Sequence, residues 1–174
     1  MAAIYRIYEY AATTTPPMKK RHVAVSGIVD APPRAVYEVL ADYRNEHPKI
    51  VPKEYFTKLE VEEGGFGAGT RILGEMRLLG TTTAFRQVVS EPDPGRVLVE
   101  THPDGSVVTT FTMDPVEGGQ KTALTISTDF VLQSSGLRAL IEGSLIALLF
   151  PRIYRKEIEL IRAHPSIRRA LPRA

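Results

Sequence analysis

Four histidines, His22, His47, His102 and His164, are the side chains of this sequence best suited to move a proton near neutral pH. His22 opens a predicted strand and His164 ends a predicted helix, so we expect both at the surface. His102 stands in a hairpin sequence, Glu-Thr-His-Pro-Asp, with no second histidine at a spacing that would hold a metal ion. His47 stands beside Glu46 and near Tyr43, where it is a candidate for an acid or base or, alternatively, a solvent-exposed helical residue.

Other reactive groups are scarce. The chain has no cysteine, which excludes thiol nucleophiles, disulfides and cysteine-ligated metals. The glycine-rich segment 64–69 links two predicted strands and does not open a helix, so a hairpin explains it better than a phosphate loop. We therefore predict no metal and no cofactor, and no motif demands catalysis.

Composition indicates one globular domain. The 174 residues are 43% hydrophobic and 24% charged, which is an ordinary balance for a chain of this length. The formal net charge of +2 is too small for a protein that neutralises several phosphates, so we expect no nucleic-acid partner. The longest nearly apolar run, 139–150, is interrupted by Glu142 and is too short to cross a bilayer. With no secretory signal and no cysteine, a cytoplasmic location is expected.

Three segments differ in character. Residues 1–17 read as an N-terminal extension, 18–163 as the folded domain, and 164–174 as a basic C-terminal tail. Within the domain, β-branched residues predict a strand over 22–29, and two prolines then open a helix that ends near Asp42, followed by a short helical stretch over 45–51.

After Pro52 the hydrophobic period changes to two, and Gly or Pro pairs divide the chain into strand-length pieces. The predicted strands are 54–63, 69–79, 81–91, 95–102, 106–114 and 121–132. Consecutive strands joined by tight turns predict an antiparallel meander, and the last element is a long helix over 135–163.

The terminal helix has one apolar face and an apolar band opposite it. At about 100° per residue, one side gathers small and aromatic residues, and we expect it to face the sheet: Leu140, Gly143, Ala147, Phe150 and Tyr154. Leu145 and Leu149 fall near the charged side, so these middle turns are apolar almost all round. That band is a candidate surface for a homodimer or another partner.

The order of these elements resembles the helix-grip (START-like, SRPBCC) superfamily, in particular its polyketide cyclase/dehydrase group. The residues that carry the resemblance are the segments 23–33, 36–43, 67–71, 89–96 and 121–126. The resemblance implies an α+β fold, with a seven-stranded curved antiparallel sheet, two short helices and a long C-terminal helix around a cavity. It also implies that the short helices carrying His47 overhang the cavity mouth.

Strand alternation then predicts the cavity lining. The opposite faces carry Arg71, Glu75, Arg77, Arg86, Glu100 and Asp129, and such charges are rarely buried unpaired. The inward set is therefore Ile72, Gly74, Met76, Leu78, Thr83, Phe85, Gln87, Val99, Thr101, Thr109, Phe111, Leu124, Ile126, Thr128 and Phe130, with Leu140, Gly143, Ala147 and Tyr154 of the terminal helix. Its small members are expected to leave space that a ligand fills.

We expect this wall to bind or transport a hydrophobic small molecule of lipid, polyketide or aromatic type, with Tyr154 and Gln87 orienting its polar end. The first alternative is a polyketide cyclase or aromatase that uses the same cavity and a polar side chain such as His47. The second is a protein-interaction module that uses the Leu145/Leu149 band.

Overall fold

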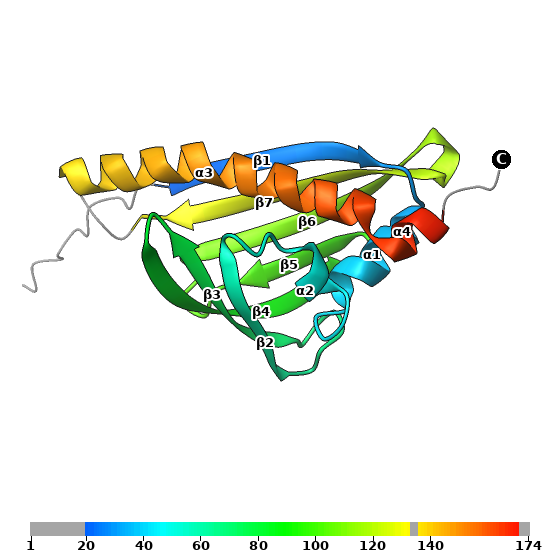
Figure 1. The fold of residues 1–174 in the computed structure, drawn as a ribbon, viewed down its shortest axis with the longest axis horizontal. Helices are drawn as coiled ribbons and strands as arrows, with labels where there is room; N and C mark the ends of the chain where they lie inside the picture. Colours follow the sequence, from blue (N-terminus) through cyan, green and yellow to red (C-terminus); the bar gives the residue numbers. More distant parts are fainter. Residues whose placement is uncertain (1–19, 133–135, 171–174) are drawn as a thin grey trace, which may run out of the picture.

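The computed structural model describes residues 20–132 and 136–170 (Figure 1). The expected extension 1–17 lies outside these residues. The described elements are β1 (Lys20–Val29), α1 (Pro33–Ala41), α2 (His47–Ile50), β2 (Phe56–Glu63), β3 (Arg71–Leu78), β4 (Thr81–Asp93), β5 (Val97–Thr101), β6 (Val107–Val116), the 3-10 turn η1 (Glu117–Gly119), β7 (Lys121–Val131), α3 (Gly136–Ala163) and α4 (Pro165–Arg169).

The seven strands form one antiparallel sheet in the order β1-β7-β6-β5-β4-β3-β2. The strands β2 to β7 follow one another as hairpins, whereas β1 pairs with β7 at the far edge. The long helix α3 lies along β1 and over β7 (Figure 1). The α+β helix-grip fold expected from the sequence is confirmed.

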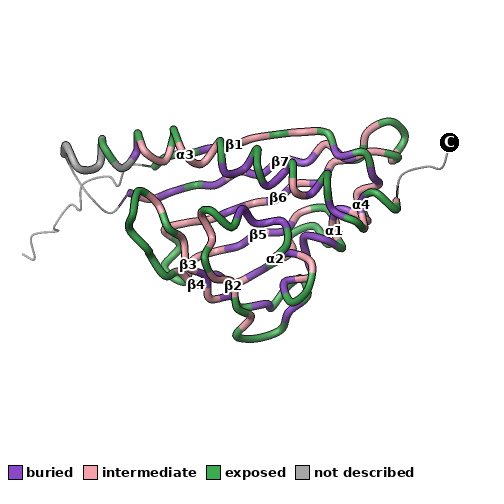
Figure 2. The backbone as a smooth tube through the Cα atoms, viewed as in Figure 1, coloured by how far each residue is buried: buried purple, intermediate pink, exposed green. Residues whose placement is uncertain are grey.

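The short helix α1 covers one end of the sheet. Pro32 and Pro33 stand at its start, where the missing amide hydrogens cost nothing. Val36, Val39 and Leu40 then return at helical spacing, and all three are buried. Figure 2 shows buried backbone in α1, β6, β7 and the C-terminal part of α3, while the turn from β3 to β4 is exposed.

The C-terminal end of α3 is held to the sheet, and α4, which follows it, packs against α1. Arg162 Nε donates to the Ile28 carbonyl at 2.7 Å, which ties α3 to β1. Residues 165–169 of the basic C-terminal segment then form α4, and the buried Ile167 joins the core. Within the described residues, no helix is both long enough and apolar enough to cross a membrane.

Candidate functional site

A cavity of about 200 Å³ lies between the concave face of the sheet and α3. Its wall is mostly aliphatic and aromatic, and it draws on α2, α3 and six of the strands. The lining residues are His47, Val51, Phe56, Leu59, Ile72, Met76, Thr83, Phe85, Gln87, Glu100, His102, Val107, Thr109, Phe111, Phe130, Phe150, Tyr154 and Glu157.

The wall contains a large part of the set expected from strand alternation. The structure places in it Ile72, Met76, Thr83, Phe85, Gln87, Thr109, Phe111, Phe130, Tyr154 and, from α2, His47. That these side chains bind a ligand stays a prediction. Leu78, Leu124, Ile126 and Thr128 are not in the wall; Leu124 and Ile126 are fully buried in the core.

Strand β5 presents the opposite face from the one predicted. Glu100 pairs with Thr109 and Leu98 with Phe111, so Leu98 and Glu100 point inward with those β6 side chains. Val99 and Thr101 face the other side, and their expected place in the lining was wrong. The prediction kept carboxylates off the inner face, whereas Glu100 is buried there, with 6% of its surface exposed.

The expectation that Gly74 leaves empty space was wrong. Gly74 pairs with Phe85 across β3 and β4, and the Phe85 ring lies over it. A Cβ atom built on Gly74 would collide with that ring. Glycine at position 74 therefore makes room for the aromatic ring, and the ring lines the cavity instead.

The inner face of α3 also differs from the expected one. Ala147 is exposed, and a Cβ atom on the buried Gly143 would meet the Arg21 side chain, so neither residue lines the cavity. The side chain of Leu140 lies outside the described residues. Phe150 and Tyr154 of the expected face do line the cavity, and Glu157 joins them. Glu157 was missed, although its spacing of three residues from Tyr154 and seven from Phe150 is the helical signal that would have found it.

Glu100 is held by Tyr43 of the segment that joins α1 to α2. The Tyr43 hydroxyl donates to Glu100 Oε1 at 2.7 Å, and both side chains are buried. Burial disfavours the charged carboxylate and raises the pKa of Glu100 to about 7, although the hydrogen bond from Tyr43 opposes the shift. This carboxyl therefore exchanges its proton in the neutral range.

His47 lies against both groups, with 3% of its surface exposed, so the alternative of a solvent-exposed residue was wrong. Its ring stacks on Tyr43 with centroids 4.4 Å apart. Nδ1 lies 2.7 Å from the Leu40 carbonyl. Because a carbonyl only accepts, Nδ1 carries the proton, and Nε2 presents its lone pair 3.8 Å from Glu100 Oε1. Burial lowers the pKa of His47 to about 4, which keeps the ring neutral.

The backbone between α1 and α2 explains why His47 points inward. The Asp42 carbonyl accepts from the amides of Glu46 and His47, at 3.0 and 2.8 Å, and this closes a tight turn. Pro48 then opens α2. A single turn thus brings Tyr43 and His47 together above Glu100.

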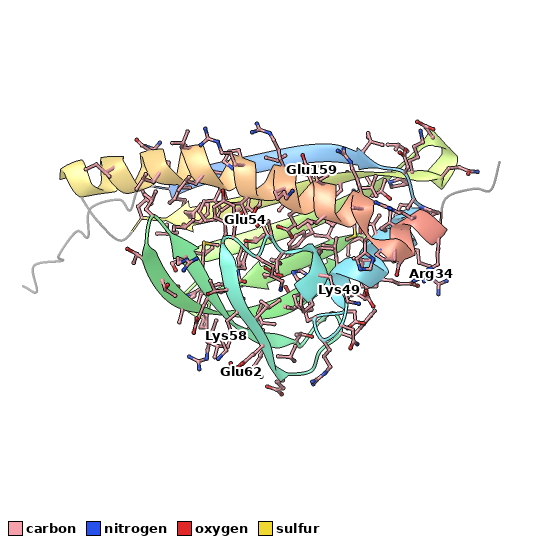
Figure 3. The ribbon with its side chains drawn as sticks, viewed as in Figure 1. Arg34, Lys49, Glu54, Lys58, Glu62 and Glu159 are labelled. Atoms are coloured by element: carbon pink, nitrogen blue, oxygen red, sulfur yellow. The ribbon has the colours of Figure 1, made fainter. Side chains whose placement is uncertain are left out.

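Glu157 enters the cavity from α3, with 3% of its surface exposed. Among the described residues no hydrogen bond or ion pair to its carboxyl is found. Burial, together with the charge of Glu100, raises the pKa of Glu157 well above its usual value. Charged side chains such as Arg34, Lys58 and Glu159 lie on the outside of the molecule instead (Figure 3), and that of Glu159 is 61% exposed.

Three buried hydroxyl groups in and beside the wall are hydrogen-bonded to one another. Thr109 Oγ1 and Thr128 Oγ1 lie 2.8 Å apart, and Thr128 also bonds the Tyr154 hydroxyl. This chain connects β6, β7 and α3 through side chains that are all buried. Each hydroxyl of this network thus has a hydrogen-bond partner, whereas the Glu157 carboxyl has none among the described residues.

The other histidines serve different surroundings. His22 is exposed beside Asp129, as expected. His164 is buried, with 4% of its surface exposed and Nε2 2.9 Å from Glu46 Oε2, so its expected surface position was wrong. His102 reaches the cavity edge, where Nδ1 lies 2.6 Å from Asp104 Oδ1. In the described part of the chain, no three His, Asp or Glu side chains form a group that would hold a metal ion.

The family model described as polyketide cyclase / dehydrase and lipid transport matches residues 20–164. The chain belongs to this polyketide cyclase/dehydrase family. The resemblance seen in the sequence is thereby confirmed. No curated protein sequence matches the chain.

Solved structures with the same fold include proteins from distant sources. KanY has a TM-score of 0.71 and 22% identity, covering 84% of this chain and 98% of its own. The Zhui aromatase/cyclase from Streptomyces sp. R1128 has a TM-score of 0.60 and 22% identity, and the match covers 87% of this chain and 94% of that protein. Ginseng major latex-like protein 151 from Panax ginseng has a TM-score of 0.57 and 14% identity, and the match covers 88% of this chain and 99% of that protein. At these identities the likeness shows the fold alone.

Within the polyketide cyclase/dehydrase fold, this chain combines an apolar chamber with a compact polar end. Glu100, His47 and Glu157 supply hydrogen-bond acceptors and exchangeable protons, and Tyr154 supplies a hydroxyl. Such a wall suits a ligand that is mostly apolar and has one polar end.

Proposed function

We propose that the protein binds or carries a small apolar molecule, of lipid, polyketide or aromatic type, in the cavity between the sheet and α3. The supporting observation is the wall itself, in which aromatic and aliphatic side chains surround a few buried polar groups. An apolar protein cavity of about 150 Å³ is large enough to hold benzene. A cavity of about 200 Å³ is larger than that, so it has room for at least one aromatic ring or a short alkyl chain.

The test is a fluorescence titration with 1-aminoanthracene, a small neutral dye that brightens in apolar surroundings. Met76 lines the cavity and Arg77, its neighbour on β3, is exposed. We expect Met76→Trp to weaken dye binding by about tenfold or more because the indole occupies the chamber. Arg77→Trp should bind like the wild type. A wild-type protein without saturable dye binding, or equal affinity in both variants, contradicts the proposal.

A second candidate is an enzyme of the cyclase type that transfers protons on a carbonyl compound. The observation that favours it is the contact between Glu100 and His47 inside the cavity, since a base whose pKa is about 7 is matched to neutral pH. Glu100 would remove a proton from the carbon beside the carbonyl.

This candidate is tested with 2-octanone in deuterated water, by following the exchange of its α-hydrogens by NMR. We expect the wild type to accelerate exchange and Glu100→Gln to slow it by about 100-fold. Exchange no faster than in buffer contradicts the enzymatic role and leaves the binding role standing.

A further inference from the structure

Two buried carboxyl groups face one cavity, and no Lys or Arg side chain that the structure describes forms an ion pair with either of them. Glu100 enters from β5 and Glu157 from α3. Within residues 20–132 and 136–170, the ion-pair partner of Glu100 is the neutral ring of His47, and Glu157 has none. A buried charge is normally paired, because removing it from water without a partner is costly. Burial favours the neutral form of both carboxyls, and a cation that entered the cavity would supply the partner that an ionised carboxylate needs.

The polar groups at this end of the cavity offer acceptors to a ligand, and the Glu100 and Glu157 carboxyls can donate only while they hold their protons. His47 uses its Nδ1 proton on the Leu40 carbonyl and leaves the Nε2 lone pair facing Glu100. Tyr43 already donates to Glu100, and Tyr154 is engaged with Thr128. A ligand with several donors can therefore engage the Nε2 lone pair and both carboxyl groups at once.

Aromatic rings surround the same space. The Phe111 edge lies against His47, with centroids 6.0 Å apart. Phe130, Phe150 and Tyr154 form a row in which successive ring centroids are 4.7 and 5.8 Å apart. The faces of such rings attract a cation within about 6 Å of their centroids.

We propose that the ligand is a hydrophobic amine, whose ammonium group binds between Glu157 and Glu100 while its apolar part lies against the aromatic rings. This inference rests on the proposed binding function and names its ligand class. An ammonium ion offers three donors to these acceptors. It also favours the ionised carboxylate of Glu157, whose pKa is otherwise raised by burial.

The same geometry disfavours a carboxylate ligand. A carboxylate ligand would require Glu100 and Glu157 to stay protonated, because an ionised carboxyl in the same space repels a second negative charge. An alcohol of the same length fills the apolar part but brings a single donor and no charge. We therefore expect the order amine, alcohol, carboxylate.

The experiment uses octylamine, 1-octanol and octanoate at pH 7.5 as competitors of 1-aminoanthracene. For the wild type we expect octylamine to bind about tenfold or more tighter than 1-octanol, and octanoate to bind weakest. Glu157→Gln should reduce the preference for the amine to within about threefold while leaving 1-octanol unchanged. The matched control is Glu159→Gln, two residues along α3 on the exposed side, which should keep the wild-type preference.

The outcomes separate this inference from the proposed function. A protein that binds the dye and 1-octanol but shows no preference for octylamine overturns the amine inference alone. A preference that survives in both Glu157→Gln and Glu100→Gln also overturns it. If neither the dye nor any octyl compound binds, the binding function fails and the inference fails with it.

Discussion

The concave face of the sheet is packed differently in its two halves. Under the C-terminal part of α3, residues such as Met113, Leu124, Ile126, Ile153 and Ile161 are fully buried and form a solid core. Toward β3, β4 and β5, inward side chains such as Met76 and Phe85 face the cavity instead. The fold thus obtains its stability mainly from one half and leaves the other free to hold a guest.

The polar groups follow the same division. The chain Thr109, Thr128 and Tyr154 lies where the solid core meets the cavity wall, and each hydroxyl has a partner. The carboxyls of Glu100 and Glu157 face the cavity. Among the described residues, Glu100 has Tyr43 and His47 beside it, and Glu157 has no hydrogen-bond or ion-pair partner. Satisfied polar groups support a structure, whereas unsatisfied ones in a cavity await a ligand.

The largest expected effect contrasts the two halves directly. Ile126→Ala should lower the free energy of unfolding by about 2–5 kcal/mol because it opens a void in the solid half. Met76→Ala should cost about 1 kcal/mol or less, because its side chain already borders unfilled space. Urea denaturation of both variants measures the difference. Equal losses would show that the two halves are packed alike.

Glu100 should make the folded protein less stable as pH rises. Its folded pKa of about 7 lies above the usual 4.5, so the folded state holds the proton more tightly. The stability of the wild type relative to Glu100→Gln should therefore fall by about 3 kcal/mol as the pH rises from 4.5 to 7. Urea denaturation across this window measures it, and a constant difference would place Glu100 in contact with solvent.

His47 should act with the opposite sign. Its folded pKa of about 4 lies below the usual 6.5, so the unfolded state binds the proton more readily. The stability of the wild type relative to His47→Asn should rise by about 3 kcal/mol as the pH increases from 4 to 6.5. If both variants shift in the same direction with pH, the assigned environments of Glu100 and His47 are wrong.

The smallest effect concerns the satisfied hydroxyl chain. Tyr154→Phe removes the bond to Thr128 but leaves Thr109 and Thr128 paired, so it should cost about 1 kcal/mol. Thermal unfolding monitored by circular dichroism measures the loss. A much larger loss would indicate that Tyr154 supports the cavity wall through more than this hydrogen bond.

The fold followed from local patterns. Alternation in the strands and the Gly or Pro pairs between them located the meander, because turn residues and period depend on near neighbours. On β3, outward Arg71 and Arg77 correctly identified the inner face, which carries Ile72 and Met76. The rule that charged side chains point outward failed on β5, because the Glu100 carboxyl is buried on the inner face.

The polar end of the site depended on contacts between distant segments. Tyr43 and Glu100 are 57 residues apart, and no local period indicates their hydrogen bond. The burial of His164 likewise depends on α4 folding back toward α1 and on Glu46. Glu157 alone carried a local signal, through its helical spacing from Phe150 and Tyr154.

The ring of Phe85 over Gly74 sets the width of the cavity between β3 and β4. A side chain at position 74 would occupy the space that the Phe85 ring fills. Replacing Gly74 by a larger residue must therefore move the Phe85 ring into the cavity or away from it. The width available to a guest is thus adjustable from a single backbone position, while the hydrogen-bonded ladder between the two strands stays as it is.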